Sequence, residues 1–175
     1  MTSIIASTNR PESYTLKVAE YYQKALRTLG TDAEILSLAN LPEKIIHPAM
    51  YEKEKIESWQ PIQNLITTSQ KFIFIIPEYN GSFPGILKVL IDACEFPVSF
   101  SGKKAALVGI STGKYGNIRG VDHFTGICHY MNLDVMPLKI HIPHIHKELN
   151  ENNEFFKEDT VKFIKLQVER FAKFF

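Results

Sequence analysis

The middle of the chain reads Lys71-Phe72-Ile73-Phe74-Ile75-Ile76-Pro77-Glu78-Tyr79-Asn80-Gly81-Ser82-Phe83-Pro84-Gly85. Its first six residues are a continuous apolar, β-rich run, which predicts a strand buried on both faces. Residues 77–85 hold two glycines and two prolines, a composition that predicts a tight loop whose backbone another group can approach closely. Residues 86–93 have helical spacing, and Pro84 can start that helix. In an open parallel sheet, ligands bind at the carboxyl end of a central strand, so this loop is the first candidate site.

Length and composition indicate one ordinary globular domain that spans residues 1–175. A chain of this size buries roughly 70% of its unfolded surface without disulfides or metals. Hydrophobic residues make up 45% of the chain and charged residues 22%, values typical of soluble proteins.

The net charge and the cysteine content indicate which classes of partner and which cellular compartment to expect. The net charge of +1 creates no field that would attract nucleic acid or an anionic membrane, so we expect neither as a partner. No run approaches the ~20 apolar residues of a membrane span. The two cysteines, Cys94 and Cys128, form no CxxC pair, which favours reduced thiols in a cytoplasmic protein.

Strand patterns alternate with helix patterns along the whole chain. We predict strands at 2–6, 33–38, 71–76, 104–110 and 134–142, the last interrupted or bent at Pro137. We predict helices at 13–29, from a cap at Ser58 onward, at 86–93, at 121–131 and at 158–174, with residues 39–52 as a surface connection. Five strands joined by helical crossovers predict a three-layer α/β/α sandwich with a five-stranded parallel sheet. These patterns leave the strand order open.

The loop at residues 7–15 combines groups that bind phosphate. Thr8, Ser13 and Thr15 carry hydroxyls, Arg10 offers charge-assisted hydrogen bonds, and the start of a helix adds unpaired N–H groups. Alternatively, Ser13 only caps the helix and Arg10 is a solvated surface residue. Neither GxxxxGK[ST] nor GxGxxG is present, which excludes a nucleoside-triphosphate P-loop and a dinucleotide fingerprint.

Two further loops follow the third and fourth predicted strands. The loop after the third strand could be only a structural turn, which would explain Pro84 and Gly85 but not residues 78–81. Tyr79 and Asn80 are expected to be exposed on a rigid loop, and such residues favour contact with a ligand. Residues 111–120 contain three glycines, with Ser111 and Thr112 at the strand end. If the strand order is 2-1-3-4-5, all three loops meet at one edge and suit a mononucleotide that carries a planar ring.

These residues resemble the NADPH-dependent FMN reductases. Residues 77–88 are similar to the signature PEYNGSxPGxLK, almost without change. Residues 7–13 resemble the phosphate loop G-[ST]-x-R-x-x-S, and residues 111–116 resemble the third flavin loop of that family. The resemblance implies a single flavodoxin-like FMN-binding domain over residues 1–175, with strand order 2-1-3-4-5.

The resemblance also implies the chemistry and the residues of the site. FMN would be the cofactor, NADPH or NADH the hydride donor, and a flavin, quinone or similar small molecule the electron acceptor. The flavin carries this reaction, so no catalytic side chain is expected. By position, the FMN phosphate would be held by Thr8, Arg10, Ser13, Tyr14 and Thr15. The isoalloxazine would be lined by Pro77, Glu78, Tyr79, Asn80 and Gly81, and its far edge closed by Ser111, Thr112 and Gly113.

Two departures from the family pattern affect these expectations. Ser7 stands where the family has glycine, so we expect a reshaped first turn and weaker phosphate binding. The helix after Lys88 also differs, and this helix commonly forms the family's dimer interface. A homodimer or homotetramer remains the expectation.

Three other interpretations are open, and one is a degenerate family member that binds no flavin, which only Ser7 supports. A non-catalytic electron carrier or flavin-binding protein has the same fold, but carriers of this kind are strongly acidic and this chain has a net charge of +1. His141, His144 and His146 suggest a metal site, but no carboxylate or cysteine completes a ligand set. We therefore predict an FMN enzyme with no metal.

Overall fold

Strand β3 lies at the centre of a parallel sheet in the computed structural model, which describes residues 1–51 and 56–174. The strands are β1 (Thr2–Ala6), β2 (Ala33–Ser37), β3 (Lys71–Pro77), β4 (Lys104–Ile110), β5 (Asp134–Val135) and β6 (Ile140–Ile142). Their order is β2-β1-β3-β4-β5, and β6 pairs with β4 further along the same edge. The predicted order is confirmed. The predicted fifth strand is split in two around Pro137.

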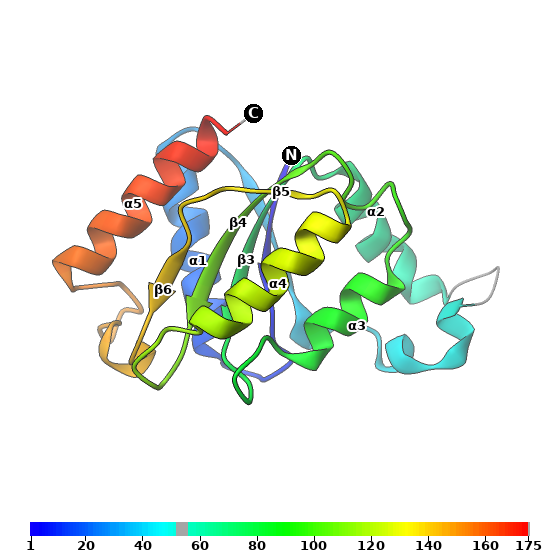
Figure 1. Cartoon of the computed structure of the whole chain (residues 1–175), viewed down its shortest axis with the longest axis horizontal. Coiled ribbons are helices and arrows are strands. Elements are labelled where there is room, and N and C mark those ends of the chain that lie inside the picture. The colour runs from blue at the N-terminus through cyan, green and yellow to red at the C-terminus, as the bar shows by residue number, and fades with distance from the viewer. Residues whose placement is uncertain (52–55, 175) are drawn as a thin grey trace.

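Helices cover both faces of the sheet, as the sandwich prediction requires (Figure 1). The α-helices are α1 (Tyr14–Thr28), α2 (Gln60–Thr68), α3 (Gly85–Ala93), α4 (Ile118–Tyr130) and α5 (Glu158–Ala172). Short 3₁₀ turns occupy Leu38–Asn40, Glu43–Ile46, Pro48–Tyr51, Glu57–Trp59 and Ile145–Lys147. Within residues 1–51 and 56–174, no helix has both the length and the apolar character needed to cross a membrane.

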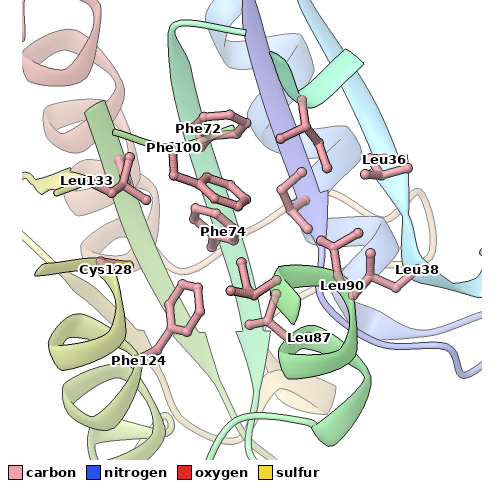
Figure 2. Packing of buried hydrophobic residues seen from close by; sticks show 14 of the residues in the cluster. Leu36, Leu38, Phe72, Phe74, Leu87, Leu90, Phe100, Phe124, Cys128 and Leu133 are labelled. Carbon is pink, nitrogen blue, oxygen red and sulfur yellow. The ribbon is translucent and has the colours of Figure 1, made fainter. Parts of the chain in front are cut away.

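Successive side chains along each strand point to opposite faces of the sheet, so the hydrophobic core has two parts, one on each face. Phe72 and Phe74 of β3 point toward α2, α3 and α4 (Figure 2), whereas Ile73 and Ile75 pack against α1 and α5. Burial on both faces explains why this strand has a continuous apolar sequence.

A buried glutamine completes the interrupted edge of the sheet. Gln167 of α5 is fully buried, and its Nε2 donates to the carbonyl of Leu107 in β4 (3.1 Å) and to that of Leu138 (2.9 Å), which lies in the interruption between β5 and β6. Its Oε1 accepts from the hydroxyl of Tyr22 in α1 at 2.7 Å. These bonds join α1, α5 and the sheet, and they satisfy polar groups that burial would otherwise penalise.

Three local predictions need correction. Ser58 does not cap a helix: a 3₁₀ turn runs through Trp59, and α2 begins at Gln60 with no side-chain cap. Residues 39–51 are not only a surface connection, since Ile45 and Met50 belong to the core; residue 52 lies outside the described residues. Helix α4 begins at Ile118, three residues before the predicted start, because Asn117 caps it.

We expect Cys128 to be chemically inert in the folded protein. It is fully buried in the core beside Phe124 (Figure 2), and burial raises the pKa of its thiol to about 12. At pH 8 only about one molecule in ten thousand would carry the reactive thiolate. Labelling with Ellman's reagent should spare Cys128 in the native protein and reach it after unfolding. A Cys128→Ala variant is the control, and a smaller native signal from it would contradict this prediction.

Candidate functional site

The three loops predicted to meet do surround one pocket at the carboxyl edge of the sheet, at the bottom of Figure 1. The pocket has a volume of about 430 Å³. It is lined by Thr8, Arg10, Pro11, Glu12, Ser13, Tyr14, Thr15, Pro77, Glu78, Tyr79, Asn80, Ile110, Ser111, Thr112 and Ile145.

Every predicted site residue lines this pocket except Gly81 and Gly113. Both glycines lie in the loops themselves, one in the turn after β3 and one in the loop after β4. Four further residues line the pocket that the sequence did not mark as site residues: Pro11, Glu12, Ile110 and Ile145. Ile145 lies in the segment after β6, and no sequence motif there indicates a site residue.

Helix α1 directs its amino terminus at one end of the pocket. The Oγ of Ser13 accepts a hydrogen bond from the N–H of Leu16 at 3.2 Å, so Ser13 is the N-cap. Within the described residues, no protein group accepts from the N–H groups of Tyr14 and Thr15. The first turn holds no acidic residue. This end of the pocket therefore has the donors and the helix dipole that an anion needs.

The serine that replaces the family glycine does not enter the pocket. Ser7 is fully buried, and its hydroxyl donates to the carbonyl of Ile5 at 3.2 Å. Its backbone is not in the left-handed region, so the turn does not require glycine here. The turn is thus formed without strain at Ser7, and the expected reshaping has no visible cause.

A tight hairpin forms the second wall. The N–H of Glu78 donates to Ile110 at 2.9 Å, and Tyr79 and Ser82 exchange backbone hydrogen bonds of 2.9 and 3.0 Å. Between them Asn80 and Gly81 have φ of +50° and +77°, the conformation that an Asn-Gly pair favours in a two-residue hairpin.

Tyr79 links this hairpin to the first loop. Its hydroxyl lies 2.5 Å from Oγ1 of Thr8, and the guanidinium of Arg10 lies over its ring, 4.7 Å from the centroid. The structure thus places Tyr79 beside the residues predicted to bind phosphate. A cation above an aromatic face is held there electrostatically, so Tyr79 orients Arg10 at the pocket rim.

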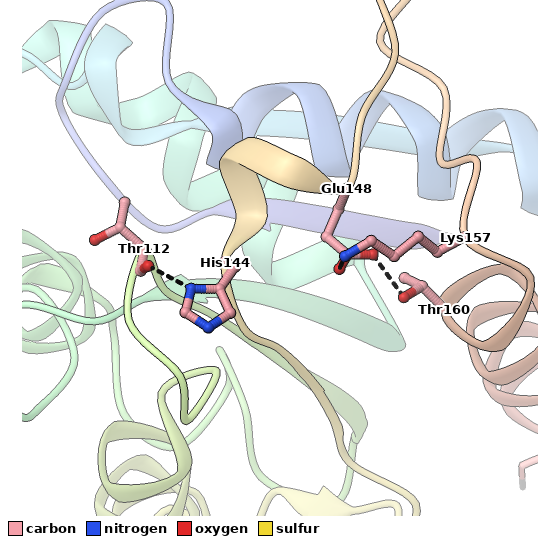
Figure 3. Close-up of polar contacts among 5 residues, drawn as sticks. All are labelled: Thr112, His144, Glu148, Lys157 and Thr160. Atoms are coloured by element: carbon pink, nitrogen blue, oxygen red, sulfur yellow. Dashed lines mark hydrogen bonds and ion pairs between the residues drawn. The ribbon is translucent and has the colours of Figure 1, made fainter.

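Ser111 folds the third loop upon itself. Its hydroxyl donates to the carbonyl of Gly113 at 3.0 Å and accepts from the N–H of Gly116 at 2.9 Å. The N–H of His144 also donates to Gly113, at 2.9 Å, and Nδ1 of His144 lies 3.1 Å from the carbonyl oxygen of Thr112 (Figure 3). The Ser111 hydroxyl therefore stabilises the loop, and Thr112 stands at the rim.

Asn117 fixes the position of α4 against the sheet. It is fully buried with φ of +61°; its Oδ1 accepts from Gly120 at 3.1 Å, and its Nδ2 donates to the carbonyl of Ile76 at 3.0 Å. A Cβ on Gly120 would come within 2.6 Å of the Ser82 carbonyl carbon, so the missing side chain lets α4 approach the hairpin. Asn117 thereby ties α4 to β3, and Gly120 lets α4 pack against the hairpin.

The histidines near β6 brace the same loop. Nδ1 of His141 lies 3.2 Å from the carbonyl oxygen of Gly116, and burial lowers the pKa of His141, so its neutral form is favoured. Among residues 1–51 and 56–174, no group of three or more His, Cys, Asp or Glu side chains is arranged to hold a metal ion.

A buried carboxylate holds the segment that carries Ile145. Glu148 accepts from Thr160 at 2.7 Å and pairs with Lys157 at 2.5 Å (Figure 3). Thr160 lies in the first turn of α5, where a negative charge interacts favourably with the helix dipole. These contacts fix residues 145–148 beneath the pocket.

The residues present fit FMN. The end of the pocket at α1 offers backbone N–H groups, hydroxyls and Arg10 for a phosphate. The lining also includes the apolar residues Pro77, Ile110 and Ile145; Pro77 and Ile110 are neighbours in the register of β3 and β4, and they offer an apolar surface for a flat ring.

Loss of the Asn117 side chain should destabilise the protein and separate α4 from β3. Asn117→Ala leaves two buried backbone groups unpaired and places alanine at a positive φ, so we expect a loss of about 2–4 kcal/mol in the free energy of unfolding. Asn117→Gly keeps the backbone conformation accessible and should cost about 1 kcal/mol less. Urea denaturation measures both. Wild-type stability in either variant would contradict the assigned role.

Comparison with known sequences agrees with this geometry. The family described as NADPH-dependent FMN reductase matches residues 2–147. The chain is 24% identical over 174 residues to a 2-hydroxy-1,4-benzoquinone reductase from Burkholderia sp, covering 97% of this chain and 93% of that protein. It is 32% identical over 125 residues to a quinone reductase from Pseudomonas putida, covering 69% of this chain and 64% of that protein.

Solved structures share the fold. FerB, a flavoenzyme NAD(P)H:(acceptor) oxidoreductase from Paracoccus denitrificans, superimposes with a TM-score of 0.79 at 22% identity, over 98% of this chain and 94% of FerB. An FMN-dependent NADH-azoreductase from Bacillus anthracis, solved in complex with FMN, gives a TM-score of 0.61 at 14% identity, over 98% of each chain. With the family match over residues 2–147, the chain belongs to the NADPH-dependent FMN reductase family.

Proposed function

We propose that this chain binds FMN in the three-loop pocket and uses NADPH or NADH to reduce a quinone, flavin or similar small acceptor. The observation that carries the proposal is the convergence of a helix amino terminus, an arginine and the apolar residues Pro77, Ile110 and Ile145 on one pocket of about 430 Å³. That volume suits a ligand of mononucleotide size.

In this proposal the protein supplies binding and orientation. When bound, FMN supplies the hydride and electron transfer chemistry. Arg10, Ser13 and the N–H groups of Tyr14 and Thr15 hold the phosphate. The hairpin that contains Tyr79 and the loop at 111–113 hold the ring between them.

A quinone is the acceptor we favour. The Burkholderia relative is named as a 2-hydroxy-1,4-benzoquinone reductase and the Pseudomonas putida relative as a quinone reductase. A quinone is flat and apolar with two carbonyl oxygens, so it suits a site already shaped for a planar ring.

The remaining features of the proposal concern organisation and location. We propose one FMN-binding domain over residues 1–175, in the cytoplasm, where the free thiols of Cys94 and Cys128 would stay reduced. We also propose a homodimer or homotetramer. Large exposed apolar side chains such as Phe96 and Val98 support self-association.

Steady-state oxidation of NADPH and NADH by the FMN-loaded protein tests the function. We expect donor oxidation that depends on added 1,4-benzoquinone and is lost from the protein stripped of FMN. FMN-loaded protein that oxidises neither donor with benzoquinone or free flavin would contradict the proposal. It would instead point to an electron carrier or a flavin-binding protein without turnover.

Tyr79 should contribute to FMN affinity through Arg10. Removing Arg10 (Arg10→Ala) should weaken FMN binding by about tenfold, the effect of one charge-assisted hydrogen bond. Tyr79→Leu should weaken binding in the wild-type background but much less in the Arg10→Ala background, with a coupling of about 0.5–1 kcal/mol. Quenching of flavin fluorescence gives each Kd.

Tyr79→Phe and Tyr130→Leu serve as controls for this cycle. The first keeps the ring under Arg10 and removes only the bond to Thr8, so it should weaken binding less than Tyr79→Leu does. The second removes a tyrosine that is 86% exposed on α4 and should have no effect. Additive effects of Arg10→Ala and Tyr79→Leu would show that Tyr79 does not act through Arg10.

A further inference from the structure

A second, smaller cleft of about 180 Å³ adjoins the main pocket. It is lined by Glu78, Tyr115, Ile118 and Arg119, so it lies between the start of the hairpin and the first turn of α4. Glu78 lines both the cleft and the pocket, which makes them neighbours on either side of that residue. The groove between α1 and α5 shares no residue with the pocket.

The cleft has an exposed aromatic ring, Tyr115, and a cation, Arg119, in its lining, and a second cation, Lys114, lies beside the ring. Tyr115 is 60% exposed, and the Nζ of Lys114 lies over its ring, 4.9 Å from the centroid. Within residues 1–51 and 56–174, neither Lys114 nor Arg119 forms an ion pair. Positive charge that no carboxylate neutralises, beside a solvent-exposed ring, suits an anion that carries its own aromatic group.

The backbone beneath these side chains is held firmly although the side chains are exposed. Ser111 and His141 bind Gly116, and Asn117 caps α4 from its buried position. A Cβ on Gly116 would lie 2.6 Å from the nitrogen of Ile142, so this backbone packs directly on β6. Tyr115 and Arg119 therefore project from a rigid support, which lowers the entropic cost of binding a ligand between them.

We propose that this cleft binds the adenosine end of the hydride donor and that Arg119, helped by Lys114, selects a donor with a 2′-phosphate. The inference rests on the proposed function. If the nicotinamide of the donor enters the main pocket, the adenosine at the other end of the donor must lie on a surface next to that pocket. The guanidinium matches a phosphate in shape and charge, and the Tyr115 ring offers a face on which adenine can stack. Glu78 lies between the two sites and can accept hydrogen bonds from ribose hydroxyls.

The test compares both donors in the FMN-loaded wild-type protein and in Arg119→Gln. We expect Arg119→Gln to lower kcat/KM for NADPH by about tenfold and to leave that for NADH within about twofold. Lys114→Gln should act in the same direction with a smaller effect. Arg27→Gln is the matched control, since it removes the same charge from the last turn of α1 and should change neither value. Equal changes for both donors, or none, would overturn the proposal.

A binding measurement separates this inference from the proposed function. Calorimetric titration with 2′,5′-ADP requires no turnover, and we expect Arg119→Gln to weaken its binding by about tenfold while 5′-AMP binding stays the same. If the wild-type protein oxidises neither donor, the proposed function fails while this titration still tests the cleft. No 2′,5′-ADP binding to the wild-type protein overturns the cleft assignment. So does a Tyr115→Ser variant that leaves kcat/KM unchanged for both donors, because the adenine on which Tyr115 would stack is common to NADPH and NADH.

Discussion

The hydrogen-bond ladder of the parallel sheet continues past the ends of three strands, and the site depends on that continuation. The N–H groups of Ser7, Glu78 and Ser111 donate to the carbonyls of the neighbouring strands at 3.0, 2.9 and 3.1 Å. Each bond holds the first residue of a loop in register with the sheet. The three loops therefore leave the same edge from fixed positions, and the pocket between them inherits the rigidity of the sheet.

Polar side chains extend this order into the loops. Tyr79 binds Thr8, Asn117 binds Ile76, and Ser111 closes its own loop. The loops are thus ordered by contacts with one another before any ligand arrives. A ligand that binds a preformed site loses less of its binding energy to ordering the protein, which is consistent with a pocket built for a flat cofactor.

The sequence predicted what depends on local pattern and missed what depends on distant partners. A continuous apolar run marked β3 because this strand is buried on both faces, and Asn80-Gly81 marked the tight turn. The role of Asn117 depends on Ile76, 41 residues away, and no local pattern shows it. Similarly, Ser58 has the chemistry of a helix cap, yet the chain makes a 3₁₀ turn there that buries Trp59.

Titration of the purified chain with FMN, followed by the visible absorbance of the flavin, tests the central claim most directly. The account predicts a spectral shift that saturates near one FMN per chain. Riboflavin, which lacks the phosphate, should bind far more weakly, because the end of the pocket at α1 contributes only through that group. No saturable shift with FMN, or equal affinity for FMN and riboflavin, would contradict the assignment of the three-loop pocket.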